Sequence, residues 1–116
     1  MKLFDSNIPL YAALDQDLGK KLIARKLLSA GILDGDACVS VQVIREVTNC
    51  LIKKSTLSID EIKEVVAWLK KLWVVVDTEE MISDAVDIKC RYGIQFYDAC
   101  IVAAAKSAHC SELHSE

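Results

Sequence analysis

The feature that most constrains the fold is an alternation of short strand-like runs with longer stretches that have helical spacing. The strand-like runs lie at residues 2–5, 37–40, 73–76 and 113–115, and the intervals between them carry apolar residues at helical spacing. Strands that alternate with helices along a chain usually pair in parallel. The pattern therefore predicts one α/β domain over residues 1–116, a three-layer sandwich with a mainly parallel central sheet and helices on both faces.

Capping residues set the expected limits of the helices. Ser6 and Asn7 supply capping side chains at the start of the first helix, Ser40 precedes the third, and Ser58 with Glu61 forms a capping box for the fourth. The run at 73–76 is continuous and rich in valine, which is typical of a strand covered on both faces. The predicted helices span residues 7–14, 18–32, 41–54, 59–72, 79–93 and 96–109.

Composition excludes several classes of protein. The chain is 53% hydrophobic with 4 glycines and 1 proline, which excludes a disordered or low-complexity chain. The longest apolar runs are far below the roughly 20 residues of a membrane span, so no membrane association is expected. The N-terminus does not resemble a signal peptide. We therefore expect a cytoplasmic protein.

Neither the cysteines nor the net charge indicates a function. Five cysteines lie at least ten residues apart, with no CxxC pair, and are expected to be reduced, buried small hydrophobic residues. With a net charge of −3, the chain lacks the excess of lysine and arginine that most nucleic-acid-binding proteins carry. That absence counts only mildly against such a function, because bound cations let an acidic site accept a polyanion.

Three acidic residues stand out by their positions. Asp5 follows the first strand, Glu46 lies six residues beyond the second strand, and Asp98 opens a helix that is otherwise almost wholly apolar. A strand end and the first turns of two helices can meet at one edge of a parallel sheet. Clustered carboxylates repel one another, and a hard cation such as Mg²⁺ or Mn²⁺ would relieve that repulsion. Each residue by itself also has a simpler interpretation: Asp5 as a turn residue, Glu46 as a solvated residue and Asp98 as a helix cap.

Three segments in register resemble the PIN-domain family. They are LFDSN at residues 3–7, VSVQVIRE at residues 39–46 and FYDACIVAAA at residues 96–105. Their order, spacing and element type agree with the family over essentially the whole chain. The closest group is the small toxin ribonucleases of the VapC kind.

The resemblance implies a metal-dependent endoribonuclease with a PIN-like fold. Asp5, Glu46 and Asp98 would coordinate Mg²⁺ or Mn²⁺, and Ser6 and Asn7 would orient the first carboxylate or a water. The cation would activate water for in-line attack on an RNA phosphodiester. The resemblance also implies a homodimer and an antitoxin partner that silences the toxin. The mean hydropathy of +0.26, high for a small domain, independently favours shared apolar surface.

The chain departs from the family pattern at its end. The family continues from its last strand as Leu-x-Thr/Ser-x-Asp, and residues 113–116 match only the first four places. Ser115 keeps the hydroxyl position, whereas the fourth acidic residue would come next, with Glu116 as a possible substitute. The C-terminal end of the family pattern is thus missing from this sequence, which puts a second metal and full activity in question.

Other functions remain open at this stage. A housekeeping or weakened PIN-type RNA-processing protein would have the same motifs. A phosphoacceptor signalling domain would use Asp77 and an acidic Mg²⁺ pocket, but no paired acids follow the first strand and no suitable lysine ends a strand. A nucleotide-binding enzyme would need a glycine-rich phosphate loop, which the sequence lacks.

Overall fold

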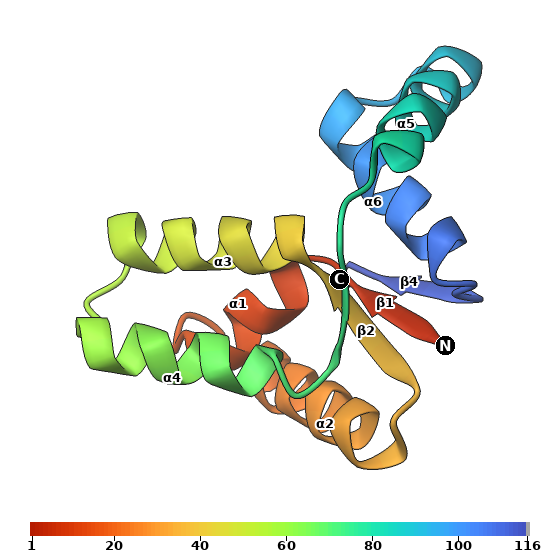
Figure 1. Cartoon of the computed structure of the whole chain (residues 1–116). Helices are drawn as coiled ribbons and strands as arrows, with labels where there is room; N and C mark the ends of the chain where they lie inside the picture. Colours follow the sequence, from red (N-terminus) through yellow and green to blue (C-terminus); the bar gives the residue numbers. More distant parts are fainter. Residues whose placement is uncertain (116) are drawn as a thin grey trace.

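The computed structural model describes residues 1–115 and shows a single four-stranded sheet with helices on both sides (Figure 1). The strands are β1 (Lys2–Phe4), β2 (Ala37–Ser40), β3 (Trp73–Val75) and β4 (Glu112–His114). The helices are α1 (Asn7–Ala13), α2 (Leu18–Asp34), α3 (Val41–Lys54), α4 (Ile59–Leu69), α5 (Glu79–Tyr92) and α6 (Phe96–Ser107). The strand order is β3-β2-β1-β4, and every pair is parallel. The predicted α/β sandwich is therefore confirmed.

The two faces of the sheet are covered by different helices. Gly31 of α2 lies so close to Ala37 of β2 and Phe4 of β1 that a Cβ at position 31 would sit 2.6 Å from the Ala37 Cβ. Helices α1 and α4 gather on the same side as α2, whereas α5 and α6 lie on the other side and project beyond the sheet (Figure 1). Helix α5 packs mainly along α6, so these two helices form an arm.

The predicted caps form, with one exception. Ser40 Oγ accepts the Val43 N–H at 3.1 Å, and Ser58 and Glu61 form the expected capping box. The Ser6 side chain makes no capping hydrogen bond at the start of α1. The second helix also runs further than predicted, because Gly35, with φ 64°, ends it and Gly31 is an interior packing position.

The third strand differs from its prediction. It lies at the edge of the sheet, and Trp73 is 64% exposed although its run is wholly apolar. Its indole Nε1 donates to the Gly35 carbonyl oxygen at 3.2 Å, which holds the ring against the turn before β2. The expectation of a strand covered on both faces is therefore wrong. A run of apolar residues shows that a strand can be buried, but it does not show whether the strand lies at the edge of the sheet.

No helix within residues 1–115 is long and apolar enough to cross a bilayer.

Candidate functional site

Asp5 is fixed at the carboxyl end of β1 by its own backbone. Its N–H donates to the His114 carbonyl oxygen of β4 at 2.9 Å, and its carbonyl oxygen accepts the Ile8 N–H at 3.2 Å. The carboxylate Oδ1 accepts the N–H of Ser6 at 2.7 Å, and the side chain is half-buried. One carboxylate oxygen thus stabilises the strand-to-helix turn.

Glu46 lies in the second turn of α3, which begins directly after β2. Its side chain is exposed, and Oε1 accepts a hydrogen bond of 3.0 Å from Gln42 Nε2. The same Nε2 lies 3.4 Å from the carbonyl oxygen of Tyr97, in the first turn of α6. Gln42 therefore links Glu46 to the segment that carries Asp98.

Asp98 is the third residue of α6 and is exposed to solvent. The residue is exposed although the helix is otherwise almost wholly apolar and Ile101 is buried one turn further on. The first turn of α6 rotates the carboxylate outward, where the free N–H groups at the helix N-terminus favour a negative charge. This position leaves the carboxylate accessible to a ligand.

The carboxylate oxygens of Asp5, Glu46 and Asp98 suit a hard cation, whereas the three side chains do not form an assembled metal site. Carboxylates are the ligands that Mg²⁺ and Mn²⁺ prefer. Among the described residues, however, no group of three or more histidine, cysteine, aspartate or glutamate side chains is placed to hold one ion. A metal shared by Asp5, Glu46 and Asp98 stays a prediction.

The supporting residues named from the sequence lie around Asp5. Ser6 contributes its backbone N–H to the Asp5 carboxylate, and Asn7 opens α1 as a half-buried residue. Ser115 directly follows β4, whose His114 carbonyl holds Asp5. Glu116, the possible fourth acidic residue, lies outside the described residues.

A cleft of about 210 Å³ lies between α3 and the arm. Two of its lining residues, Arg45 and Tyr97, directly precede Glu46 and Asp98 in the sequence. It is lined by Gln42, Arg45, Asp77, Met81, Ile82, Phe96, Tyr97 and Cys100. Burial and the nearby charge of Asp77 both raise the pKa of the Cys100 thiol, which disfavours its thiolate form. The cleft thus combines one cation, Arg45, with exposed aromatic surface from Tyr97.

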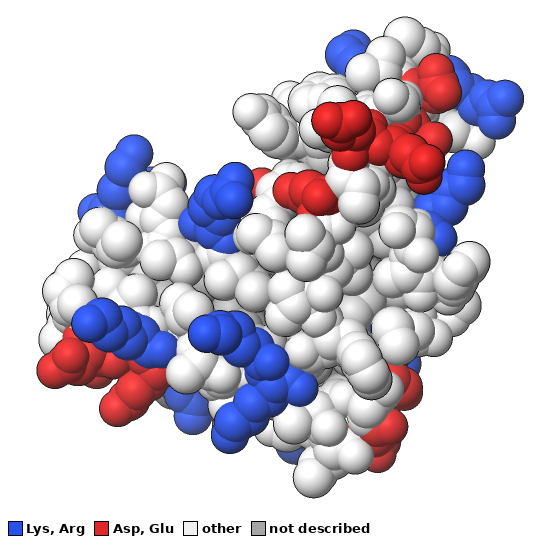
Figure 2. Space-filling model, viewed as in Figure 1, with Lys and Arg blue, Asp and Glu red and all other residues white. Residues whose placement is uncertain are grey.

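Charge is unevenly distributed on the face shown in Figure 2. Acidic side chains gather on the arm of α5 and α6, with lysine and arginine along its edge, whereas basic side chains lie over α3, and α4 carries both signs. The cleft lies between these two regions. A polyanion entering it would be attracted from the α3 side and repelled from the arm, except where cations neutralise the carboxylates.

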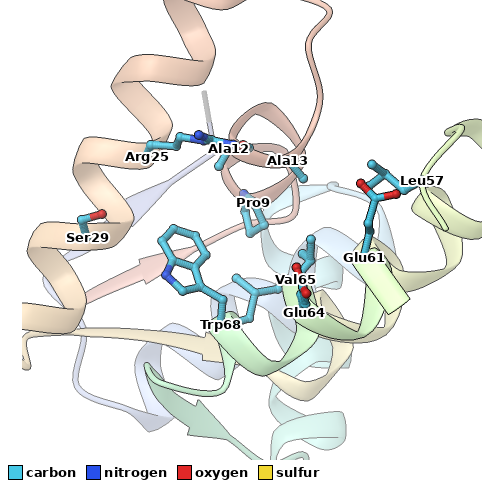
Figure 3. A pocket seen from close by; sticks show the side chains of 11 residues that line it. Pro9, Ala12, Ala13, Arg25, Ser29, Leu57, Glu61, Glu64, Val65 and Trp68 are labelled. Atoms are coloured by element: carbon cyan, nitrogen blue, oxygen red, sulfur yellow. The ribbon is translucent and has the colours of Figure 1, made fainter. Parts of the chain in front are cut away.

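A larger pocket of about 560 Å³ lies away from the three carboxylates, between α1, α2 and α4 (Figure 3). Its lining is Pro9, Ala12, Ala13, Arg25, Ser29, Leu57, Glu61, Glu64, Val65, Trp68 and Leu69. Arg25 Nε donates to the Ala12 carbonyl oxygen at 2.9 Å, which holds the guanidinium at the rim. An apolar floor with a few charged groups is typical of a site that binds a small molecule or a peptide segment.

Sequence reasoning did not foresee two contributions to the site. Gln42 connects α3 to α6, and His114 holds Asp5 through its backbone carbonyl. The four-residue spacing of Gln42 and Glu46 could have predicted the hydrogen bond between their side chains. No signal existed for the second, because a backbone contact between strands depends on register and not on the side chain.

Comparison with solved structures gives the same fold. A toxin–antitoxin complex from Klebsiella pneumoniae superposes with a TM-score of 0.73 at 19% identity, covering 97% of this chain and 83% of the other. VapC20 from Mycobacterium tuberculosis, described as a toxin that cleaves the sarcin–ricin loop, gives a TM-score of 0.81 at 14% identity and covers 100% and 89%. No curated protein matches the sequence.

The family assignment comes from the sequence itself. Residues 2–116 match the PIN domain, which is nearly the full length of the chain. The strand order, the position of Asp5 after β1 and the opening of α6 by Asp98 agree with the resemblance seen in the three sequence segments. The match displaces the phosphoacceptor alternative built on Asp77. This chain belongs to the PIN domain family.

Proposed function

We propose that the protein is a cytoplasmic, metal-dependent endoribonuclease and the toxin of a toxin–antitoxin pair. The observation that carries the proposal is the placement of Asp5, Glu46 and Asp98 on elements that meet at the carboxyl edge of the sheet. β1 and β2 are parallel neighbours, so Asp5 and the start of α3 lie at the same edge. The Gln42 bridge brings the start of α6 to that edge.

An assembled three-ligand centre is not required for this role. Mg²⁺ keeps several of its waters and commonly uses only one or two carboxylates directly. Asp5, Glu46 and Asp98 would hold Mg²⁺ or Mn²⁺ partly through such waters. The bound cation would supply Lewis-acid activation of water and of the phosphodiester.

The side chains themselves would bind and orient the substrate. Arg45 lies exposed on the cleft and would attract an RNA phosphate, and Tyr97 would offer its ring to a base. Gln42 would keep Glu46 turned toward the start of α6. Ser6, Asn7 and Ser115 would position the Asp5 carboxylate and waters near it.

A cleavage assay with matched variants tests the proposal. Labelled RNA is incubated with the purified chain in Mn²⁺ or Mg²⁺, and with excess EDTA. Asp5→Asn and Asp98→Asn are expected to lower cleavage by roughly 100-fold or more, and Glu46→Gln nearly as much. Asp87→Asn, the same change on an exposed residue of α5, is expected to leave cleavage unchanged.

The outcome that contradicts the proposal is equally specific. Full metal-dependent cleavage by the folded Asp98→Asn variant would exclude Asp98 from the site. Cleavage that persists in EDTA would exclude metal dependence. A chain that binds RNA without cleaving it would favour the alternative of a weakened PIN-type RNA-processing protein.

The larger pocket supports the proposal of an antitoxin partner. Its apolar floor and charged rim would accept an apolar segment of that protein. Trp68, half-buried on α4, lies in the pocket (Figure 3), and Trp68→Ala is expected to weaken binding of the proposed antitoxin by at least about tenfold. Lys63→Ala, an exposed change on the same helix, serves as the control, and equal affinity of both variants would remove the pocket from the interface.

A further inference from the structure

Two of the five cysteines are in contact although they are 72 residues apart in sequence. The Sγ atoms of Cys38 and Cys110 lie 3.3 Å apart, and both thiols are free. A disulfide needs a separation of about 2.0 Å, so the sulfurs would have to approach by only about 1.3 Å. Rotation about the Cα–Cβ bonds supplies movements of this size without a change in fold.

The backbone holds the two cysteines in place. Cys38 lies in β2, opposite Leu3 of β1. The Cys110 N–H donates to the Ala105 carbonyl oxygen at 2.8 Å, and the Ser111 N–H donates to the Met1 carbonyl oxygen at 2.9 Å. The segment after α6 is therefore attached both to its own helix and to the beginning of β1.

The contact lies on the α6 side of the sheet. Ala37 faces Gly31 of α2, and neighbouring residues of a strand point to opposite faces, so Cys38 points away from α2. Helix α6 and the connection to β4 cover that face (Figure 1). A bond between the two sulfurs would join the centre of the sheet to the C-terminal end of α6.

The two thiols differ in accessibility. Cys38 is completely buried, and burial together with the Cys110 contact raises the pKa of its thiol to about 12. Cys110 is half-buried and is therefore the more accessible residue of the pair. The expectation of buried cysteines is confirmed for Cys38 and wrong for Cys90, which is exposed, while the other three are partly accessible.

We propose that Cys38 and Cys110 form a redox-active dithiol that a low-molecular-weight disulfide, such as oxidised glutathione, converts to an intramolecular disulfide. The Cys110 thiolate attacks one glutathione sulfur and releases the first glutathione. Cys38 then loses its proton and attacks Cys110 Sγ in the mixed disulfide, releasing the second. The protein gives up two electrons and two protons, and one glutathione disulfide becomes two glutathione thiols.

The consequence of the bond follows from the position of the arm. Helix α5 packs mainly on α6, and α6 contacts the sheet chiefly through β4 at its edge. A Cys38–Cys110 disulfide would add a covalent tether from β2 to the segment that ends α6. Oxidation would therefore fix the C-terminal end of α6 covalently to the sheet, and a thiol reductant would remove that link.

Peptide mapping tests the proposal directly, because trypsin places each cysteine on a separate peptide. The full-length chain is oxidised with glutathione disulfide, alkylated under denaturing conditions and digested. The expected product links residues 27–45 to residues 107–116, and the number of free thiols falls from five to three. Dithiothreitol is expected to restore all five.

Variants and melting temperature complete the experiment. The Cys110→Ser variant is expected to form no intramolecular disulfide, whereas Cys90→Ser, at the exposed cysteine, should still lose two thiols. Oxidation of the parent chain is expected to raise Tm by about 5 °C or more, since the bond closes a long loop. Five free thiols after oxidation, a bond between other cysteines, or an unchanged Tm in the linked protein would overturn the proposal.

Discussion

Gln42 and Glu46, one turn apart on α3, are joined by a hydrogen bond of 3.0 Å from Nε2 to Oε1. The same amide nitrogen lies 3.4 Å from the Tyr97 carbonyl oxygen. A neutral side chain thus connects one candidate metal ligand to the helix that carries another. This relationship makes Gln42 a positioning residue that can be tested separately from the carboxylates.

We expect Gln42→Ala to lower RNA cleavage by roughly tenfold without abolishing it, because Glu46 would lose its orientation but keep its charge. The measurement is kcat/KM in Mn²⁺, with Asn49→Ala, an exposed change on α3, as the control. Gln42→Glu would place a second negative charge near Glu46 and should be worse than Gln42→Ala. Activity equal to the parent chain in both variants would show that the bridge has no role in catalysis.

Metal binding should be visible in stability as well as in activity. A ligand that binds only the folded chain raises Tm, so Mn²⁺ should stabilise the parent more than Asp5→Asn or Asp98→Asn. In metal-free buffer these variants should unfold at the same temperature as the parent or slightly higher, since one negative charge is removed from the site. Equal Mn²⁺-induced shifts in all three proteins would place the ion elsewhere.

Gly31 should not tolerate a side chain. A Cβ there would lie 2.6 Å from the Ala37 Cβ, so Gly31→Ala is expected to lower the free energy of unfolding by about 1–3 kcal/mol. Gly19→Ala is the matched control, because its new Cβ would meet only the Asp17 carboxylate at 3.4 Å. Urea unfolding of the two variants separates the loss of packing space from the general effect of removing a helical glycine.

The apolar surface of the arm supports the proposed homodimer. Ile82 and Val86, one turn apart on α5, are 52% and 47% exposed. Light scattering should give a mass of twice 12.8 kDa, and Ile82→Asp should shift the protein toward the monomer. Ser83→Asp introduces the same charge at the neighbouring exposed position and should leave the dimer intact. A monomeric parent chain at high concentration would rule out the homodimer.

Stability should fall in alkaline solution partly because of Cys38. Burial raises the pKa of its thiol from 9.0 to about 12, so the unfolded chain loses this proton at a lower pH than the folded chain. Between those values the unfolded state binds fewer protons, and the free energy of unfolding decreases as pH rises, by at most about 1.4 kcal/mol per pH unit. Cys38→Ala should flatten this slope in urea titrations from about pH 8 to pH 10, and Cys90→Ala should not.

The sequence by itself determined the elements and their order. The capping residues Ser40 and Ser58 bond to backbone groups only three positions away, so local spacing is enough to predict the starts of α3 and α4. Alternation of strands and helices predicted the parallel sheet for a similarly general reason. The positions of Asp5 at a strand end and Asp98 in a first turn were readable in the same way.

Tertiary structure alone decided what those elements contact. Trp73 is exposed because β3 lies at the edge, and Asp98 faces solvent because of how α6 packs on α5 and β4. The 3.3 Å contact of Cys38 with Cys110 joins segments 72 residues apart. Helix caps and strand-forming runs depend on neighbours a few residues away in the sequence. The edge position of a strand, the rotation of a helix and the contact of two thiols depend instead on register and packing between distant segments, which local sequence spacing does not reveal.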